Sequence, residues 1–302
     1  MSEITGDAAL AQPERPARRG RALRRFLRHR GAVASAFVLL VVFLGALCAP
    51  LMEHWLGHGP NDPDLLKRFQ PPSWEFPLGT DEAGRDVLLR LLYGGRVSLL
   101  VGLAAALASA VIGTAIGILA GYHGGRLDAF LMRLTDAVIS LPTLALLIVL
   151  AAIDLKKVGI PDSIAQSEAV SLYRIIVIIS LVGWTGVARL VRGATLSMRA
   201  REFVRAAVAL GAPARRIMLV HILPNVIGPV IVATTLSVGG IILAESVLSY
   251  LGLGIQPPIA SWGNMLSNAQ EMLTQAPQLV IYPGLAIMVT VIAFNFLGDG
   301  LQ

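Results

Sequence analysis

Two histidines with metal-ligand spacing lie in the first quarter of the sequence. His54 and His58 are four residues apart and follow Glu53, so a helix would place them on one face, as a zinc site requires. Gly57 and Gly59 disfavour a helix at this point. We therefore expect exposed polar side chains at the end of an apolar run, and we predict no metal site.

The other chemistry-bearing residues do not form the pattern of an active site. The sequence shows no paired carboxylates, no metal triad, and no Ser and His with a reason to meet. A phosphate-binding loop needs Gly-Lys-Ser/Thr, but no glycine precedes Lys67, Lys156 or Lys157. We predict that the chain has no catalytic residues, is not an enzyme, and binds no cofactor or nucleotide itself.

One acidic residue, Glu245, lies in the outer part of a long apolar run. An ionisable group costs about 2.5 to 3.5 kcal/mol at the centre of a membrane on insertion scales, so it needs a specific environment. One interpretation places Glu245 near a transport pathway. The other places it near the outer surface, where it faces water or caps a neighbouring helix. The sequence leaves both open.

A polar stretch between apolar runs, residues 193–225, predicts a short helix, a sharp turn and a second helix. Helix-forming residues extend to Gly211, which can adopt the left-handed conformation that ends a helix, and Pro213 can begin the next one. On the first helix Phe203, Ala207 and Leu210 share one face, and arginines lie on another. Such a helix can dock in a groove of another protein or lie flat on the inner leaflet of a membrane.

The overall composition of the chain is that of a membrane protein. Hydrophobic residues make up 55% of the 302 residues and charged residues 15%, against about 25% in a soluble domain. The mean hydropathy is +0.70. The formal charge of +6 does not indicate nucleic-acid binding, because the basic residues are not set among stacking aromatics. The single cysteine, Cys48, excludes an internal disulfide. We predict an integral membrane protein.

The apolar runs predict six membrane-spanning helices, each near the length of about 20 residues that crosses a bilayer. They are placed at residues 31–52, 97–121, 136–153, 173–192, 226–250 and 279–298. The first run follows an Arg-rich segment, but it is longer than the core of about 7 to 15 residues in a signal peptide. We expect it to be an uncleaved helix.

The distribution of basic residues predicts the orientation. Six spans place both termini on one side, and with the Arg-rich tail inside, seventeen of the 25 Lys and Arg lie on inner segments and eight on outer ones. Basic residues near the ends of spans favour the cytoplasm. We predict a multi-pass protein of the inner membrane with both termini cytoplasmic. The tail can contact anionic lipid, at about 1 kcal/mol per Arg.

Small side chains repeat every four residues in the second span: Ala105, Ser109, Gly113, Gly117 and Gly121. Such a ridge lets the backbone of a neighbouring helix approach closely. We expect this face to be buried in the helix bundle. The alternative is that Ala and Gly are simply abundant here.

The segment before the second span predicts an interfacial helix that begins near Thr80 and Asp81. Asp81 with Arg85, and Asp86 with Arg90, have the four-residue spacing and the acid-first order that stabilise a helix. We expect this helix to lead into the second span.

The stretch around Gly211 also resembles the EAA motif of binding-protein-dependent ABC importer permeases. In that motif Glu-Ala-Ala is followed after three residues by Gly and, ten to thirteen residues later, by Ile-x-Leu-Pro. The chain has Arg205-Ala206-Ala207, then Gly211, then His221-Ile222-Leu223-Pro224. It departs from the motif at Arg205, where Glu is expected, and at His221, where Ile is expected.

Three further stretches resemble the dipeptide, oligopeptide and nickel branch of that family, namely residues 77–86, 245–254 and 293–300. Together with the Arg-rich tail they extend the resemblance over nearly the whole chain. The resemblance implies an all-α bundle of six membrane helices, in which a five-helix type I ABC importer core follows one N-terminal helix. It divides the chain into a basic cytoplasmic tail at 1–30, a first helix and extracytoplasmic linker at 31–96, and the importer domain at 97–302 with its coupling loop at 193–225.

The resemblance also implies a mechanism and partners. The short helix would be a coupling helix that fits a cleft on a separate ATPase subunit, and its contact residues would be Glu202, Phe203, Arg205, Ala206, Ala207, Leu210, Gly211, Leu223 and Pro224. The implied assembly has a second permease subunit, expected to be a different chain, two ATPase subunits that bind ATP and Mg²⁺, and a periplasmic or lipid-anchored substrate-binding protein.

Two points keep alternatives: which solute is transported, and what drives the transport. Peptides are expected over nickel or another small solute only because they are more common cargo in the family. An ion-coupled secondary carrier is the alternative mechanism, but such carriers place ionisable residues near the bilayer centre, and the predicted spans have almost none.

Overall fold

The computed structural model describes residues 27, 29–157, 159, 161 and 167–301. Within these ranges the chain is helical and forms no strand beyond an isolated bridge between Thr80 and Asp86. The predicted all-α class is therefore confirmed. The basic tail predicted at residues 1–30 lies almost wholly outside the described residues.

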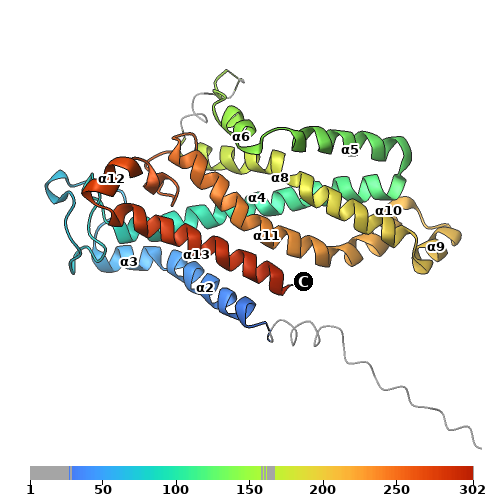
Figure 1. Ribbon diagram of the computed structural model, residues 1–302, viewed down its shortest axis with the longest axis horizontal. Coiled ribbons are helices and arrows are strands. Elements are labelled where there is room, and N and C mark those ends of the chain that lie inside the picture. Colours follow the sequence, from blue (N-terminus) through green and yellow to red (C-terminus); the bar gives the residue numbers. More distant parts are fainter. Residues whose placement is uncertain (1–26, 28, 158, 160, 162–166, 302) are drawn as a thin grey trace, which may run out of the picture.

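The helices run lengthwise in an elongated bundle (Figure 1). Helices α9 and α10 lie at one end, here called the α9 end, and α3 and α12 lie at the other, here called the α12 end. The helices are α2 (Arg30–Leu47), α3 (Ala49–Leu56), η1 (Leu65–Lys67), α4 (Val87–His123), α5 (Gly125–Ser140), α6 (Thr143–Ala151), α8 (Glu168–Arg199), α9 (Glu202–Ala209), α10 (Ala214–Arg216), η2 (Ile217–Ile222), α11 (Leu223–Tyr250), η3 (Asn264–Leu266), α12 (Ala269–Gln275) and α13 (Gln278–Gly300).

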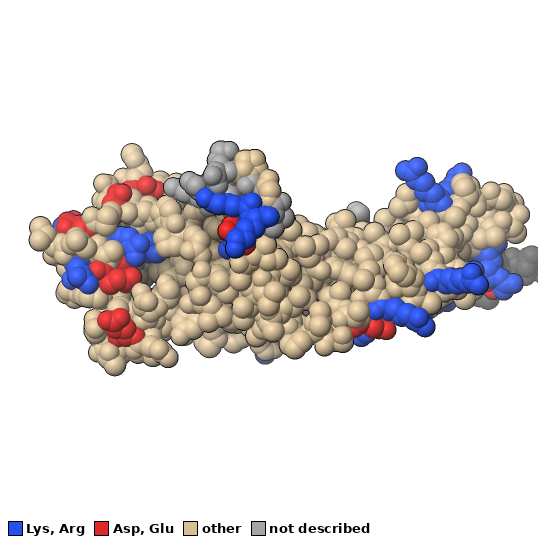
Figure 2. Space-filling view, turned by 90° about the horizontal axis from the view of Figure 1, so that it is seen from above, with Lys and Arg blue, Asp and Glu red and all other residues tan. Residues whose placement is uncertain are grey.

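Five described helical runs are long and apolar enough to cross a membrane: α2, α4, α8 from Ala169, the run from Ala214 to Tyr250, and α13. They confirm five of the six predicted spans, and α5 with α6 supplies the sixth if this bent pair counts as one span. In the view of Figure 2 charged residues form groups at the left, near the middle beside the grey atoms and at the right, and an uncharged stretch separates the last two. The molecule is a multi-pass membrane protein by length and composition.

The third predicted span, 136–153, is wrong as a single helix. Helix α5 ends at Ser140, and α6 turns away by 86° after a break at Leu141 and Pro142. A proline disfavours the helical conformation in the residue before it, and Leu141 is extended, with φ −80° and ψ 140°. The span therefore breaks at Pro142.

The ridge of small residues on α4 is buried, as predicted, and α8 covers it. A Cβ on Gly113 would lie 2.5 Å from the Trp184 carbonyl oxygen, and one on Gly117 would lie 2.6 Å from the Ala188 carbonyl oxygen. Only glycine permits this approach of two backbones. The α4–α8 pair is the central contact of the bundle, and the other long helices pack around it.

The interfacial helix predicted from Thr80 does not form. Residues 80–86 make a turn in which Gly84 is left-handed at φ +77°, and α4 begins only at Val87, with the Asp86 carboxylate capping the Leu89 N–H at 2.9 Å. Gly84 packs so closely on the backbone of Asp64 that its Cβ would lie 1.8 Å from the Asp64 carbonyl oxygen. This long-range contact overrides the local helix pattern.

The two predicted charge pairs of this segment differ in outcome. Arg85 Nε lies 2.7 Å from an Asp81 carboxylate oxygen, but across a turn rather than along a helix. Arg90 is not paired with Asp86, because Asp86 caps α4 and contacts His58 at 2.9 Å. Arg90 instead approaches Asp81, at 3.5 Å.

Candidate functional site

The segment at the α9 end folds as the sequence predicts. Helix α9 ends at Ala209, Gly211 is left-handed with φ +79°, and α10 follows Pro213. The Gly211 N–H donates to the Val208 carbonyl at 2.9 Å, and the Ala212 N–H to the Ala207 carbonyl at 3.0 Å. This pair of bonds is a Schellman motif, which ends a helix and turns the chain sharply.

One side chain, Val204, anchors α9 to the bundle. It is 1% exposed and packs in an apolar cluster with residues of α4, α8, η2 and α11, namely Ile118, Val187, Val191, Ile217, Ile222 and Val226. Val204 was not among the residues predicted for docking. Its signal was available, because an apolar residue next to Phe203 widens the apolar face of an amphipathic helix.

The apolar residues predicted for docking extend away from this anchor. Leu210 is 88% exposed and Phe203 45% exposed, while Ala207 is half-buried. Glu202, Arg205 and Ala206 are exposed beside them. Val208, which the prediction omitted, is also exposed. Helix α9 is thus held from one side and presents apolar and charged side chains on another.

The connection from α9 into the long helix α11 is irregular. Residues 217–222 form a π-helical turn, in which the Leu223 N–H bonds to the Met218 carbonyl five residues earlier. Pro224 follows in the first turn of α11, where its missing N–H is tolerated. His221, in the π turn, lies 6.5 Å from the Phe203 ring between centroids. Two contacts, through Val204 and through Phe203, therefore link α9 to this turn.

Ion pairs tie α5 to α8 near the same end. Arg192 binds both carboxylate oxygens of Asp128, at 2.5 and 2.6 Å. Arg189 contacts Asp136 at 2.5 Å, and both of these side chains are at least half exposed. An exposed pair of this kind contributes about 0.2 to 1 kcal/mol. The bidentate Arg192 pair has the better geometry for fixing the position of α5.

Glu245 lies at the opposite end of α11 and is fully buried. Its carboxylate accepts hydrogen bonds from the hydroxyls of Ser249 at 2.7 Å and Ser98 at 3.2 Å. The same hydroxyls accept from the backbone N–H groups of Ile255 at 3.0 Å and Trp262 at 3.2 Å. Glu245 therefore connects α4 and α11 to the loop at 251–268.

The burial of Glu245 rules out that its carboxylate faces water. Of the alternative that it faces water or caps a neighbouring helix, the first part is wrong, because the residue is 0% exposed, and its carboxylate accepts from the Ser98 and Ser249 hydroxyls. A role at the transport pathway stays a prediction. The geometry shows a positioning role, in which one carboxylate holds two serines that in turn hold a loop.

Replacing Glu245 by alanine should loosen the loop at 251–268. The Ser98 and Ser249 hydroxyls lose their buried acceptor, which costs about 2 kcal/mol. The unfolding temperature of the purified chain in detergent should fall by about 4 to 8 °C. Glu245→Gln keeps an acceptor oxygen and should recover at least half of the loss. An unchanged unfolding temperature for Glu245→Ala would contradict the positioning role.

The two histidines considered for metal binding do not share a helix. Helix α3 ends at Leu56, Gly57 is left-handed, and His58 bonds to Asp86 at 2.9 Å and packs on the ring of Phe76. Among the described residues no group of three or more His, Cys, Asp or Glu side chains could hold a metal ion. The candidate site is therefore the segment at the α9 end.

Comparison with known proteins gives two family matches. Residues 113–302 match the family described as binding-protein-dependent transport system inner membrane component. Residues 18–72 match the N-terminal transmembrane domain of oligopeptide transport permease C. The first match covers more than half of the chain and includes α9, the π turn and α11.

Individual relatives agree with these matches. The chain is 40% identical to the oligopeptide transport system permease protein OppC of Haemophilus influenzae over 93% of this chain and 86% of that protein. It is 40% identical to the dipeptide transport system permease protein DppC of Bacillus subtilis, over 93% and 83% of the two chains. OppC of Bacillus subtilis is 35% identical, over 93% and 87%. The similarity thus extends over nearly the whole length of each protein.

Proposed function

The chain belongs to the family of binding-protein-dependent transport system inner membrane components, and from this membership we propose that it is a permease subunit of an ATP-driven importer of di- or oligopeptides. It forms half of the translocation pathway and catalyses no reaction itself. The assembly contains a second, related permease chain, two ATPase subunits that bind ATP and Mg²⁺, and a periplasmic or lipid-anchored substrate-binding protein. Peptide cargo is supported by the names of the relatives.

The main support for this proposal is that α9 is anchored on one side and exposes apolar side chains on the other. Leu210 and Phe203 are apolar and exposed, while Val204 fixes the helix to the bundle. Rigid anchoring with an exposed apolar tip is what a helix needs to transmit force to a partner. When ATP closes the two ATPase subunits, α9 is pushed as a rigid body, and the π turn passes this movement to α11.

The proposed orientation places the α9 end in the cytoplasm. Nine arginines on α5, α8, α10 and the segment around α9 support it: Arg126, Arg133, Arg189, Arg192, Arg199, Arg201, Arg205, Arg215 and Arg216. Basic residues at span ends favour the cytoplasmic side. The N-terminus of α2 and the C-terminus of α13 then lie on the cytoplasmic side as well, and the α12 end faces outward.

Reconstitution tests the proposal directly. The chain, its permease partner and the two ATPases in proteoliposomes should take up labelled dipeptides or longer peptides only with ATP and the binding protein present. Uptake driven by an ion gradient without ATP would support the secondary-carrier alternative instead. Nickel uptake without peptide uptake would support an ATP-driven importer whose cargo is nickel rather than peptides.

Substitution of Gly211 by valine tests the turn that aims α9. Among the described residues no atom lies within 4 Å of an added Cβ, so the effect comes from forcing a β-branched residue to φ +79°, which costs about 1 to 2 kcal/mol. The turn should open, and peptide uptake per ATP hydrolysed should fall at least tenfold in proteoliposomes.

Gly193 offers a matched control for this change. It lies in α8, its φ is not left-handed, and none of the residues that the structure describes comes within 4 Å of its Cβ position. Gly193→Val should keep at least half of the normal coupling ratio. If Gly211→Val showed normal peptide uptake per ATP hydrolysed, the turn at Gly211 would have no role in coupling.

A further inference from the structure

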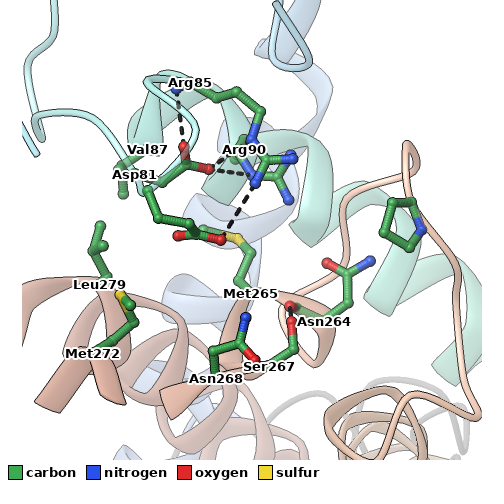
Figure 3. Close-up of a pocket in the computed structure, with 12 residues that line it drawn as sticks. Asp81, Arg85, Val87, Arg90, Asn264, Met265, Ser267, Asn268, Met272 and Leu279 are labelled. Atoms are coloured by element: carbon green, nitrogen blue, oxygen red, sulfur yellow. Dashed lines mark hydrogen bonds and ion pairs between the residues drawn. The ribbon is translucent and has the colours of Figure 1, made fainter. Parts of the chain in front are cut away.

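A cavity of about 210 Å³ lies at the α12 end (Figure 3). Its lining comes from residues 81–90 and 257–279, which are far apart in the sequence. Arg85 and Arg90 lie together on one side, and the apolar side chains of Met265, Met272 and Leu279 lie across from them. Asp81 and Glu82 lie beside Arg85 on the same side, so the cavity has one charged wall that carries both signs and one apolar wall.

Arg90 is buried and incompletely paired. It is 6% exposed, and its contacts are one hydrogen bond from Nη1 to Asn61 at 3.3 Å and an approach of Nε to Asp81 at 3.5 Å. Three of its five N–H groups therefore have no partner among the described residues. These N–H groups are not sealed from the cavity, because no Arg90 nitrogen is among the fully buried atoms without a partner, so water or a ligand there can pair with them.

Asp81 cannot complete the pairing of Arg90. One carboxylate oxygen accepts from the Ala83 N–H at 2.8 Å and the Arg85 N–H at 3.0 Å, and the other from Arg85 Nε at 2.7 Å. Its acceptor positions are largely used, so Asp81 orients Arg85 and leaves Arg90 open to the cavity. A carboxylate is the group that best matches a free guanidinium edge, because it accepts two parallel hydrogen bonds.

The chemical group that carries this carboxylate has to be small enough to enter the cavity. A cavity of about 210 Å³ has room for a group the size of an Asp or Glu side chain together with several waters. One such side chain on a docked protein can therefore reach the guanidinium of Arg90. Three of its lining residues, Pro257, Ser267 and Asn268, are exposed, so a protein surface can reach the cavity from their side.

We propose that this cavity is a docking pocket for one Asp or Glu side chain of the extracytoplasmic substrate-binding protein, whose carboxylate binds Arg90. The inference rests on the proposed function, because the orientation given there turns the α12 end outward. The lining carries two acids and two arginines, Asp81, Glu82, Arg85 and Arg90, so its charges balance. The pocket thus acts at short range, through fit and hydrogen bonds, rather than by long-range attraction.

Two variants of the complete transporter in lipid nanodiscs test this pocket, with the purified binding protein as the probe. Arg90→Gln removes the guanidinium, and Ser267→Trp fills the cavity from its exposed side while leaving Arg90 in place. Each should weaken binding at least tenfold, which corresponds to about 1.4 kcal/mol. Gln270→Trp places the same bulk on the exposed surface of α12 outside the lining and should change affinity less than twofold.

The binding protein supplies the second half of the test. Among its surface Asp→Asn and Glu→Gln variants, one should lose at least tenfold in affinity, and the loss should not add to that of Arg90→Gln. Additive losses, or normal binding by Ser267→Trp, would overturn the pocket alone. Failure of the unaltered complex to bind the binding protein would overturn the proposed function as well.

Discussion

Replacing Gly117 by leucine is expected to prevent α4 and α8 from packing and to leave little folded protein. The Cβ alone would lie 2.6 Å from the Ala188 carbonyl oxygen and 2.7 Å from the Val191 Cβ, and the first of these is backbone that no rotamer change can move. Overpacking of a core commonly costs about 1 to 3 kcal/mol, and here it also separates the two helices at the centre of the bundle. Detergent-extracted protein should be aggregated in size-exclusion chromatography, with less than a tenth of the normal monodisperse yield.

Gly186 provides the matched control for this substitution. It lies on α8, the helix that packs on Gly117, but no atom of the described part of the chain lies within 4 Å of its Cβ position. Gly186→Leu should give a monodisperse chain with an unfolding temperature within about 2 °C of the original. Equal yields of folded protein for the two leucine variants would show that the ridge does not hold the bundle together.

The ridge shows what the sequence could predict. Residues at four-residue spacing share a helix face whatever surrounds the helix, so the small side chains from Ala105 to Gly121 indicated a close helix contact. The partner helix was not predictable, because the pattern on α4 does not specify α8. The same reasoning located five spans and the turn at Gly211, since each depends on residues near in sequence.

The errors arose where distant contacts decide the local structure. Residues 80–86 have a helical charge pattern, but Gly84 packs on the Asp64 backbone and the segment turns instead. The break at Pro142 had a local signal, which a continuous apolar run at 136–153 obscured. Apolar runs show that a segment can enter a membrane, while proline shows where its helix ends.

Of the candidate sites, one was predictable from neighbouring residues and two depend on segments far apart in the sequence. The exposed face of α9 followed from helix periodicity, whereas the bond between Ser98 and Glu245 joins residues 147 apart in sequence. The docking pocket needs residues 81–90 beside residues 257–279. No pattern within either segment indicates the other, so only the fold reveals these two arrangements.

Replacing Leu210 by aspartate is expected to release the ATPase subunits without unfolding the permease. The side chain is 88% exposed, so the chain loses almost no internal packing, and Val204 still holds α9. A buried apolar anchor in an interface contributes about 2 kcal/mol or more, which corresponds to at least about 30-fold in affinity. Retention of the ATPases on the affinity-purified permease should fall by that factor, and ATP-driven peptide uptake should fall with it.

Ala209→Asp separates loss of docking from loss of the helix. It introduces the same charge one residue earlier at the end of α9, where an acid is disfavoured by the helix dipole in both variants, but about 100° around the helix from Leu210. Retention of the ATPases within threefold of normal is expected for Ala209→Asp. If α9 instead lay on the inner leaflet, neither aspartate would change ATPase retention, and both would weaken the contact with lipid. A selective loss at Leu210 therefore distinguishes a protein groove from a membrane surface as the partner of this helix.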